Sequence, residues 1–206
     1  MNKPIVWTAD IGSVEKKHFG WCRSTSTKDY KTERDICNFA EGIAIDLSND
    51  KQVAIGFECP LFIPVTDDPS LLMKARGWEG NRAWSASGGI GSLVTGLNQC
   101  VWIFEKIKLK MNKQVPLKVT FDWNDFKRDN LNIFIWEAFV TGSAKGKSHE
   151  DDAKIAAKSF WEVYPDISKS SVEAENPYSL VGAALLRSGL SKDISLLSKS
   201  CIVLRS

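Results

Sequence analysis

The hydrophobic residues of this chain fall into two patterns, short uninterrupted runs and longer stretches with helical spacing. Uninterrupted runs bounded by glycine, proline or charged residues are typical of buried strands. The run that ends at Glu58 and is closed by Pro60 predicts a central strand in a parallel arrangement. The runs that predict strands are residues 5–10, 52–60 and 131–139, with shorter candidates at 18–25, 36–39, 116–122 and 202–204. The first run and the one at 18–25 flank a short charged tip and predict a β-hairpin.

Other segments repeat their apolar residues at intervals of three or four, the period of an amphipathic helix. These segments are residues 40–48, 93–110, 148–164 and 178–188, with a short helix near Leu196. Asn176 and Pro177 have the character of a cap and a first-turn proline for the fourth of these helices, and Gly189 follows its end.

The remaining segments show neither pattern and predict loops. Residues 28–34 are polar, which predicts a loop or an edge strand, and residues 124–130 predict a charged loop. Residues 61–89 contain several glycines and prolines, and an irregular segment of this length in a compact domain is usually functional. A chain of 206 residues with 43% hydrophobic side chains suits one domain over 1–206, with an irregular insertion at about 61–90.

Composition narrows the class of protein only slightly. Lysine and arginine number 27 against 25 acidic residues, and a net charge of +2 does not by itself indicate a nucleic-acid binder. The five cysteines are widely spaced without a Cys-x-x-Cys pair, which favours free thiols over a disulfide framework or a zinc site. Neither a signal peptide nor a membrane-spanning run is evident, so we expect a cytoplasmic protein.

Acidic residues occur at or near the ends of three predicted strands. Asp10 and Glu58 each close a strand, and Glu137 stands near the end of a third. Asp10 alone could simply accept hydrogen bonds from the turn that follows it. Because the carboxyl ends of neighbouring parallel strands meet at one edge of a sheet, the acids together indicate a shared site.

The predicted helix over 148–164 begins with a serine, a histidine and three acids. Ser148 is a natural N-cap, and Asp151 approximates a capping box that also complements the helix dipole. At about 100° per residue, Asp152 and His149 project toward the apolar stripe, whereas Asp151 points away from it. Asp152 is therefore predicted to face the sheet. His149 either holds a ligand or a water molecule in place or has a structural role at the helix start.

A set of four acids is thus predicted at one edge of the sheet, namely Asp10, Glu58, Glu137 and Asp152. Gathered carboxylates repel one another and destabilise a fold unless divalent cations neutralise them. Hard oxygen ligands with open positions suit Mg²⁺ or Mn²⁺. Two such ions about 4 Å apart can activate a water molecule and stabilise the leaving oxygen of a phosphodiester. The acids therefore predict metal-dependent hydrolysis that needs no protein nucleophile.

Several short motifs, in their order along the chain, resemble the ribonuclease H-like superfamily. Residues 5–10 with the following hairpin resemble its first strand and leading aspartate. Residues 55–58, Ile-Gly-Phe-Glu, resemble the fourth strand of the RuvC-type resolvase branch, and residues 149–156, with the pattern H-x-x-D-A-x-x-A, resemble the start of its final helix. Segments 57–61 and 136–139 also resemble a family of predicted nucleases of this fold, in which a strand ends in an acid followed by Pro-Leu.

The resemblance implies a ribonuclease H-like α/β fold, with a central mixed β-sheet flanked by helices and three antiparallel strands followed by parallel ones. It also implies metal-dependent phosphodiester hydrolysis of nucleic acid, with Asp10, Glu58 and Asp152 as ligands of Mg²⁺ or Mn²⁺. The catalytic set under this interpretation is Asp10, Glu58, Glu137, His149 and Asp152. Asp151 is a spare acid that would replace Asp152 if the helix began one residue away.

Nucleic acid is the partner that this interpretation predicts. The candidate contacts are Arg76, Arg82, Lys106 and Lys110 for phosphates, and Trp84 or Trp78 for base stacking. Lysines on a helix face are also typical of a solvated surface, and aromatic residues in a long loop are also typical of packing. The nearly balanced charge and the insertion at 61–90 depart from what the minimal fold of a nuclease would show.

Two other interpretations stay open. Residues 10–13, Asp-Ile-Gly-Ser, also resemble the D-x-G-[ST] phosphate turn of the actin and sugar-kinase fold, and the glycine-rich residues 87–92 could cradle an anion at a helix N-terminus. That nucleotide-binding fold normally needs two such domains, whereas 206 residues hold one. The chain could also be a non-catalytic member that keeps the fold and some of the acids for an interaction.

Overall fold

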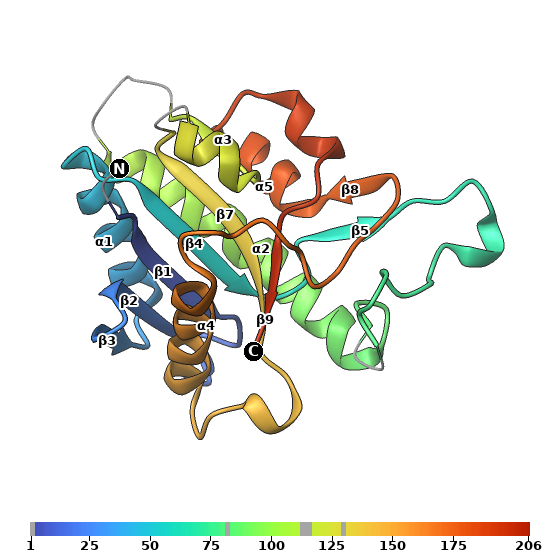
Figure 1. Ribbon diagram of the computed structural model, residues 1–206, viewed down its shortest axis with the longest axis horizontal. Helices are drawn as coiled ribbons and strands as arrows, with labels where there is room; N and C mark the ends of the chain where they lie inside the picture. The colour runs from blue at the N-terminus through green and yellow to red at the C-terminus, as the bar shows by residue number, and fades with distance from the viewer. Residues whose placement is uncertain (1–2, 81–82, 112–116, 129–130) are drawn as a thin grey trace.

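The computed structural model of the protein describes residues 3–80, 83–111, 117–128 and 131–206. Its strands are β1 (Ile5–Asp10), β2 (Gly20–Ser26), β3 (Asp29–Glu33), β4 (Val53–Glu58), β5 (Phe62–Pro64), β6 (Val119–Thr120), β7 (Ile133–Phe139), β8 (Pro177–Ser179) and β9 (Val203–Arg205). Its helices are α1 (Ile36–Ser48), α2 (Ser87–Lys110), α3 (Trp123–Arg128), α4 (His149–Val163) and α5 (Leu180–Ser188). Short 3₁₀ helices cover Pro69–Leu71, Gly142–Ala144 and Ile194–Ser198. Figure 1 shows how these elements are arranged.

A mixed sheet forms the centre of the fold, with the strand order β3-β2-β1-β4-β7-β6. β2 pairs antiparallel with both β1 and β3, whereas β1, β4 and β7 pair parallel with one another in turn. β6 and β9 also pair parallel with β7, β6 near its beginning and β9 near its end. The predicted α/β fold, with an antiparallel part followed by parallel strands, is therefore confirmed.

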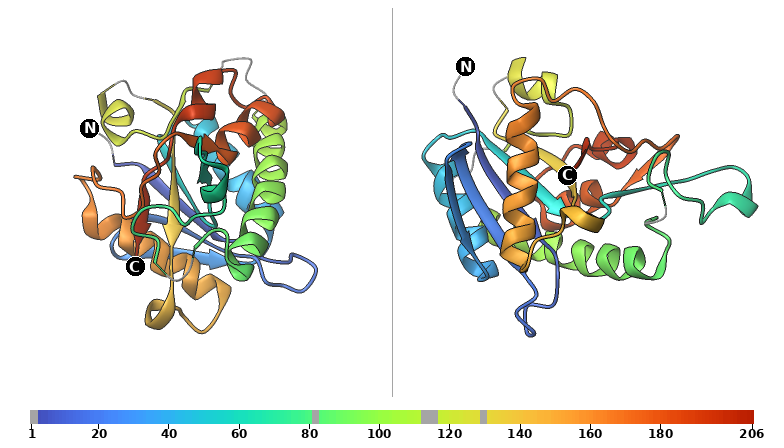
Figure 2. Two further views of the ribbon diagram at one scale, coloured as in Figure 1. Left: turned by 90° about the vertical axis from the view of Figure 1, so that its right-hand side faces the viewer. Right: turned by 60° about the horizontal axis from the view of Figure 1, so that its bottom comes forward.

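Helices cover both faces of this sheet (Figures 1 and 2). On one face, α1, α2 and α5 pack on a core that includes Trp7, Ile55 and Phe104. On the other face, α3 and α4 pack on a second core that includes Phe134 and Phe160. β4 and β7 are buried along nearly their whole length because they lie between the two layers, which explains their almost continuous apolar sequence.

The structure corrects the prediction of a third strand at residues 36–39. These residues open α1, because the Asp35 carboxylate accepts hydrogen bonds from the backbone N–H groups of Cys37 and Asn38 and caps the helix. The third strand is β3, within the polar segment predicted as a loop or an edge strand. β3 is at the edge of the sheet and has no fully buried residue, so its sequence shows no apolar alternation.

Residues 124–130 were predicted as a charged loop, but all of their described part, residues 124–128, belongs to α3. The rings of Trp123 and Phe126 are buried and pack on Phe134 of β7, while the charged side chains between and after them are partly or fully exposed. A helix of six residues is too short for its apolar spacing to stand out from a loop.

The start of α5 also differs from its prediction. Asn176 and Pro177 do not cap this helix, because Pro177 lies in β8, which pairs with β5 in a second, two-stranded sheet. The cap is Ser179, whose hydroxyl accepts a hydrogen bond from the backbone N–H of Gly182. Gly189 follows the end of the helix, as predicted, and it adopts the left-handed conformation.

α2 begins earlier than the predicted residue 93, so that the glycine-rich residues 87–92 form its first turns. Part of the predicted insertion, around the 3₁₀ helix Pro69–Leu71, projects from the body of the fold in Figure 1. Neither α2 nor any other helix in the described parts of the chain combines the length and the apolar character that crossing a membrane requires.

Candidate metal centre

Three carboxylates from distant parts of the chain meet at the carboxyl ends of the parallel strands. Asp10 is the last residue of β1, Glu58 is the last residue of β4, and the two are direct neighbours in the parallel register. Asp152 lies in the first turn of α4. Each residue contributes one carboxylate oxygen to a group whose members all lie within 4.8 Å of one another. Such a buried carboxylate triad could bind a metal ion.

α4 reaches these strand ends because its first turn packs directly on the sheet. The side chain of Ser148 caps the helix, as predicted. The hydroxyl of Thr8 in β1 donates a 2.6 Å hydrogen bond to the carbonyl of Ala153 and ties the helix to the strand. A methyl group at Gly20, the first residue of β2, would lie 2.3 Å from the carbonyl carbon of His149, so this close approach requires glycine.

Asp152, and not Asp151, is the acid that faces the strand ends. Oδ1 of Asp152 accepts a 2.6 Å hydrogen bond from the backbone N–H of Gly146, and Oδ2 lies 3.3 Å from the ammonium group of Lys145. Asp151 is exposed and accepts a 3.2 Å hydrogen bond from the backbone N–H of Lys147. This is the rotation of the helix that the spacing of its apolar residues predicted.

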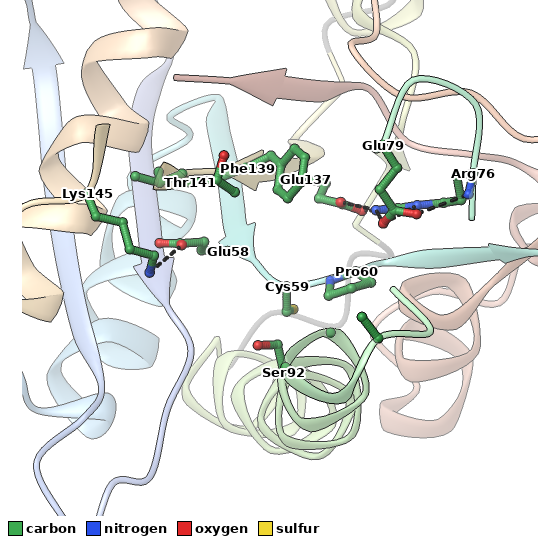
Figure 3. A pocket seen from close by; sticks show the side chains of 15 residues that line it. Glu58, Cys59, Pro60, Arg76, Glu79, Ser92, Glu137, Phe139, Thr141 and Lys145 are labelled. Carbon is green, nitrogen blue, oxygen red and sulfur yellow. Dashed lines mark hydrogen bonds and ion pairs between the residues drawn. The ribbon is translucent and has the colours of Figure 1, made fainter. Parts of the chain in front are cut away.

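The ammonium group of Lys145 bridges two of the three carboxylates. Its Nζ lies 3.2 Å from Oε1 of Glu58 and 3.3 Å from Oδ2 of Asp152, and Figure 3 shows the first of these contacts. Lys145 directly follows the 3₁₀ helix between β7 and α4. No sequence pattern marks this lysine, because a single lysine in a polar turn is common. The one available signal is its position just before the acidic start of α4.

Negative charge on the triad is unfavourable in the metal-free protein. Burial raises the pKa of Glu58 to about 9, and repulsion by Asp10 adds to this effect, while Lys145 opposes it. Burial also raises the pKa of Asp10, against the opposing hydrogen bond and charge of His149. Oε2 of Glu58 is buried and has no hydrogen-bond partner among the described residues. A divalent cation would supply the missing positive charge.

His149 contacts Asp10 from the first residue of α4. Its Nδ1 lies 2.5 Å from Oδ2 of Asp10, and its ring lies 5.2 Å, between centroids, from the ring of His18. This contact gives His149 a positioning role that differs from both roles predicted for it, because a hydrogen bond to one carboxylate oxygen of Asp10 orients the other.

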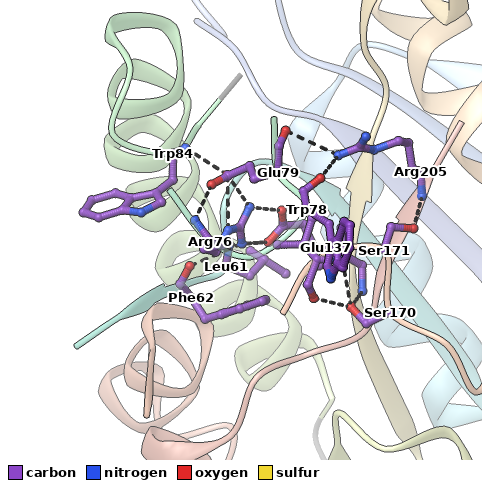
Figure 4. Close-up of polar contacts among 12 residues, drawn as sticks. Leu61, Phe62, Arg76, Trp78, Glu79, Trp84, Glu137, Ser170, Ser171 and Arg205 are labelled. Carbon is purple, nitrogen blue, oxygen red and sulfur yellow. Dashed lines mark hydrogen bonds and ion pairs between the residues drawn. The ribbon is translucent and has the colours of Figure 1, made fainter. Parts of the chain in front are cut away.

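Glu137 lies apart from the triad, in a separate buried ion pair. Its Oε1 and Oε2 each lie 2.7 Å from the guanidinium group of Arg76, and Oε2 also accepts a 2.9 Å hydrogen bond from the backbone N–H of Leu61 (Figure 4). Glu137 was predicted to lie with the other three acids at this edge of the sheet, but it does not belong to the group that Asp10, Glu58 and Asp152 form. Its carboxylate is already neutralised by a cation of the protein itself.

Arg76 was predicted to contact substrate phosphates, and its surroundings exclude this role. Its side chain is 0% exposed. Two of its N–H groups donate to Glu79, two donate to Glu137, and the fifth donates to the carbonyl of Phe62. Because all five donors of the guanidinium are used, Arg76 has a structural role: it fixes the insertion to the end of β7.

The other predicted substrate contacts lie in different surroundings. Trp84 is buried and donates its indole N–H to a backbone carbonyl, so it packs against the protein and does not present a free face for base stacking. Trp78, its alternative, is 81% exposed. Lys106 lies on α2 with its ammonium group 5.4 Å from the ring centroid of Trp102. Arg82 lies outside the described residues.

A cavity of about 380 Å³ opens beside the triad. Glu58 and Lys145 line one end, Arg76 and Glu79 line the other, and Phe139 lies between them at the end of β7 (Figure 3). The first turns of α2 complete the wall. Its volume falls within the range of small-molecule sites in proteins.

Comparison with known proteins finds no protein-family model, curated protein sequence or solved structure that matches this chain significantly. The class of protein is therefore defined by the fold and the site alone. It is an α/β protein with a mixed central sheet and a buried carboxylate triad that could bind a metal ion.

Proposed function

We propose that this protein is a metal-dependent nuclease with a ribonuclease H-like fold, which hydrolyses phosphodiester bonds of nucleic acid. The observation that carries the proposal is the convergence of Asp10, Glu58 and Asp152, whose ligand oxygens lie within 4.8 Å of one another. The strand order β3-β2-β1-β4-β7, antiparallel and then parallel, is consistent with this fold. The three acids also occur in the chain order that the resemblance implies.

Asp10, Glu58 and Asp152 would hold Mg²⁺ or Mn²⁺ through carboxylate oxygens, the hard ligands that these ions prefer. The triad fits such an ion, because a buried oxygen of Glu58 has no hydrogen-bond partner in the described part of the chain. When bound, the metal would act as a Lewis acid and lower the pKa of an attacking water molecule.

The chain's own residues would position the reacting groups around this centre. His149 holds the carboxylate of Asp10 by the 2.5 Å contact of its Nδ1, and the N–H of Gly146 holds that of Asp152. The cavity beside Glu58 would give space for the part of the substrate that adjoins the cleaved bond. Because the net charge is only +2, phosphate contacts would be local and not spread over the surface.

Asp152→Asn is expected to abolish Mn²⁺-dependent cleavage of nucleic acid, whereas Asp151→Asn leaves it unchanged. Both substitutions remove one carboxylate from the first turn of α4 and change the net charge equally, but only Asp152 belongs to the triad. The measurement is cleavage of labelled single-stranded and double-stranded DNA and RNA in Mn²⁺ and in EDTA. Circular dichroism verifies that both variants are folded.

Each alternative gives a different result in this experiment. Cleavage that persists in EDTA, or that is equal in the parent and in Asp152→Asn, would contradict the proposed function. Saturable binding of ATP and Mg²⁺ in a calorimetric titration, without cleavage of any nucleic acid, would instead favour the nucleotide-binding interpretation.

A further inference from the structure

Lys145 places its ammonium group where a cation bound by the triad would have to lie. Its Nζ is 3.2 Å from Glu58 and 3.3 Å from Asp152, which puts it between two of the three candidate ligands. A Mg²⁺ or Mn²⁺ ion coordinated by the same carboxylates would approach their oxygens to about 2.0–2.2 Å. Two positive charges cannot share this space, so binding of the metal requires Lys145 to move away.

The side chain of Lys145 is able to make this movement. It is 42% exposed, and it belongs to the turn between the 3₁₀ helix Gly142–Ala144 and α4, outside any helix or strand. Arg76, which pairs with the buried acids Glu79 and Glu137 at the other end of the cavity, is 0% exposed and uses all its donors. Lys145 is therefore the exchangeable cation of the two, and Arg76 is the fixed one.

The cavity beside Glu58 is the space into which the displaced ammonium group can turn, because Lys145 already lines it. The charged residues in its wall are Glu58, Arg76, Glu79, Glu137 and Lys145. Arg76 already donates hydrogen bonds to both Glu79 and Glu137 in the buried network. Once Glu58 binds a metal, Lys145 is the one charged side chain of the described cavity wall that is left without a partner. It would then attract an anion.

We propose that Lys145 is an exchangeable counter-ion of the metal centre. In the metal-free protein its ammonium group holds Glu58 and Asp152 together, and after the metal displaces it, it binds a phosphate group of the substrate in the adjacent cavity. This inference rests on the proposed nuclease function. It couples the two ligands: the metal releases Lys145 for the substrate, and by thermodynamic reciprocity a bound phosphate strengthens metal binding.

The first test is the affinity for Mn²⁺ alone, measured by calorimetric titration without substrate. Lys145→Gln is expected to bind Mn²⁺ about fivefold to tenfold more tightly than the parent, because no ammonium group has to be displaced. Lys147→Gln, which removes an exposed lysine from the same turn, is the matched control and is expected to bind Mn²⁺ like the parent. An unchanged or weaker affinity in Lys145→Gln would overturn the proposal.

The second test measures the contact with phosphate. A fluorescein-labelled single-stranded oligonucleotide is titrated with protein in Ca²⁺, with cleavage monitored, and in EDTA. In Ca²⁺, Lys145→Gln is expected to bind the oligonucleotide about fivefold more weakly than the parent. In EDTA the difference should shrink, because Lys145 of the parent is then engaged by the carboxylates. Equal affinities of parent and variant in Ca²⁺ would overturn the assigned phosphate contact.

Failure of this inference and failure of the proposed function give different results. If the parent binds Mn²⁺ and Glu58→Gln abolishes this binding, while Lys145→Gln changes no affinity, the metal centre stands and the role of Lys145 falls. If the parent binds no Mn²⁺, the metal centre and the role of Lys145 fall together.

Discussion

Glu58→Gln is expected to abolish Mn²⁺-dependent cleavage and, at the same time, to make the metal-free protein more stable. Glutamine keeps the shape of glutamate but lacks the charge that holds a divalent cation. Losing several kcal/mol of transition-state stabilisation corresponds to a rate lower by about a thousandfold or more. Stability should rise because the parent buries a carboxyl group beside Asp10, a cost that a neutral amide largely avoids.

The gain in stability should depend on pH in a defined direction. Burial first, and then repulsion by Asp10, raises the pKa of Glu58 from 4.5 to about 9 on folding. The unfolded chain therefore loses this proton at a lower pH than the folded protein does. The loss of folding stability that Glu58 causes is absent below the pKa of the unfolded chain. It grows between the unfolded and the folded pKa and levels off above the folded pKa. By pH 8, which lies 3.5 units above the unfolded pKa of 4.5, Glu58→Gln should exceed the parent by on the order of 5 kcal/mol in free energy of unfolding.

Urea denaturation in EDTA, followed by tryptophan fluorescence at pH 5.5 and pH 8, measures this difference. Glu41→Gln is the matched control, because Glu41 lies on α1 in an exposed ion pair with Lys110 and its substitution should change neither cleavage nor the pH dependence. A Glu58→Gln protein that cleaves like the parent would remove Glu58 from the catalytic centre. One that is less stable than the parent at pH 8 would show that its carboxylate is well accommodated without a metal.

The parts of the fold that could be predicted from local sequence are those in which burial determines the pattern of apolar residues. β4 and β7 lie between two helix layers, so burial on both faces forces an apolar run that no loop would have. β3 and α3 could not be predicted in this way. β3 is stabilised by hydrogen bonds to β2 at an exposed edge, and α3 is too short for a helical period. Their positions depend on neighbours that a local pattern does not contain.

The residues of the candidate site show the same difference between positions that a local pattern determines and positions that depend on distant neighbours. Asp10, Glu58 and Asp152 could be predicted to converge, because the ends of parallel strands and the rotation of a helix are geometric consequences of the pattern. Glu137 obeys the same rule of position, yet it is neutralised by Arg76, which comes from the irregular segment before α2. Lys145 reaches the triad through a turn. Contacts that depend on the path of a loop leave no periodic signal in the sequence.

Replacing Arg76 by methionine is expected to destabilise the protein by about 3–5 kcal/mol, the usual cost of removing one partner of a buried ion pair. Glu79 and Glu137 have side chains that are only 1% exposed, and Arg76 bonds to both. Without the guanidinium group, two buried carboxylates would face each other without a counter-charge. The free energy of unfolding from urea denaturation at neutral pH measures this loss.

Two further variants separate the lost charge pairing from lost packing. Arg187→Met breaks an exposed ion pair with Glu105 and should cost less than about 1 kcal/mol. Combining Arg76→Met with Glu79→Gln and Glu137→Gln should restore much of the lost stability, because no unpaired charge then remains buried. If the triple variant is as unstable as Arg76→Met alone, Arg76 stabilises the fold through its shape and its bond to the carbonyl of Phe62. The charges of Glu79 and Glu137 would then not contribute to stability. A role in the cavity that both residues line would be the next hypothesis to test.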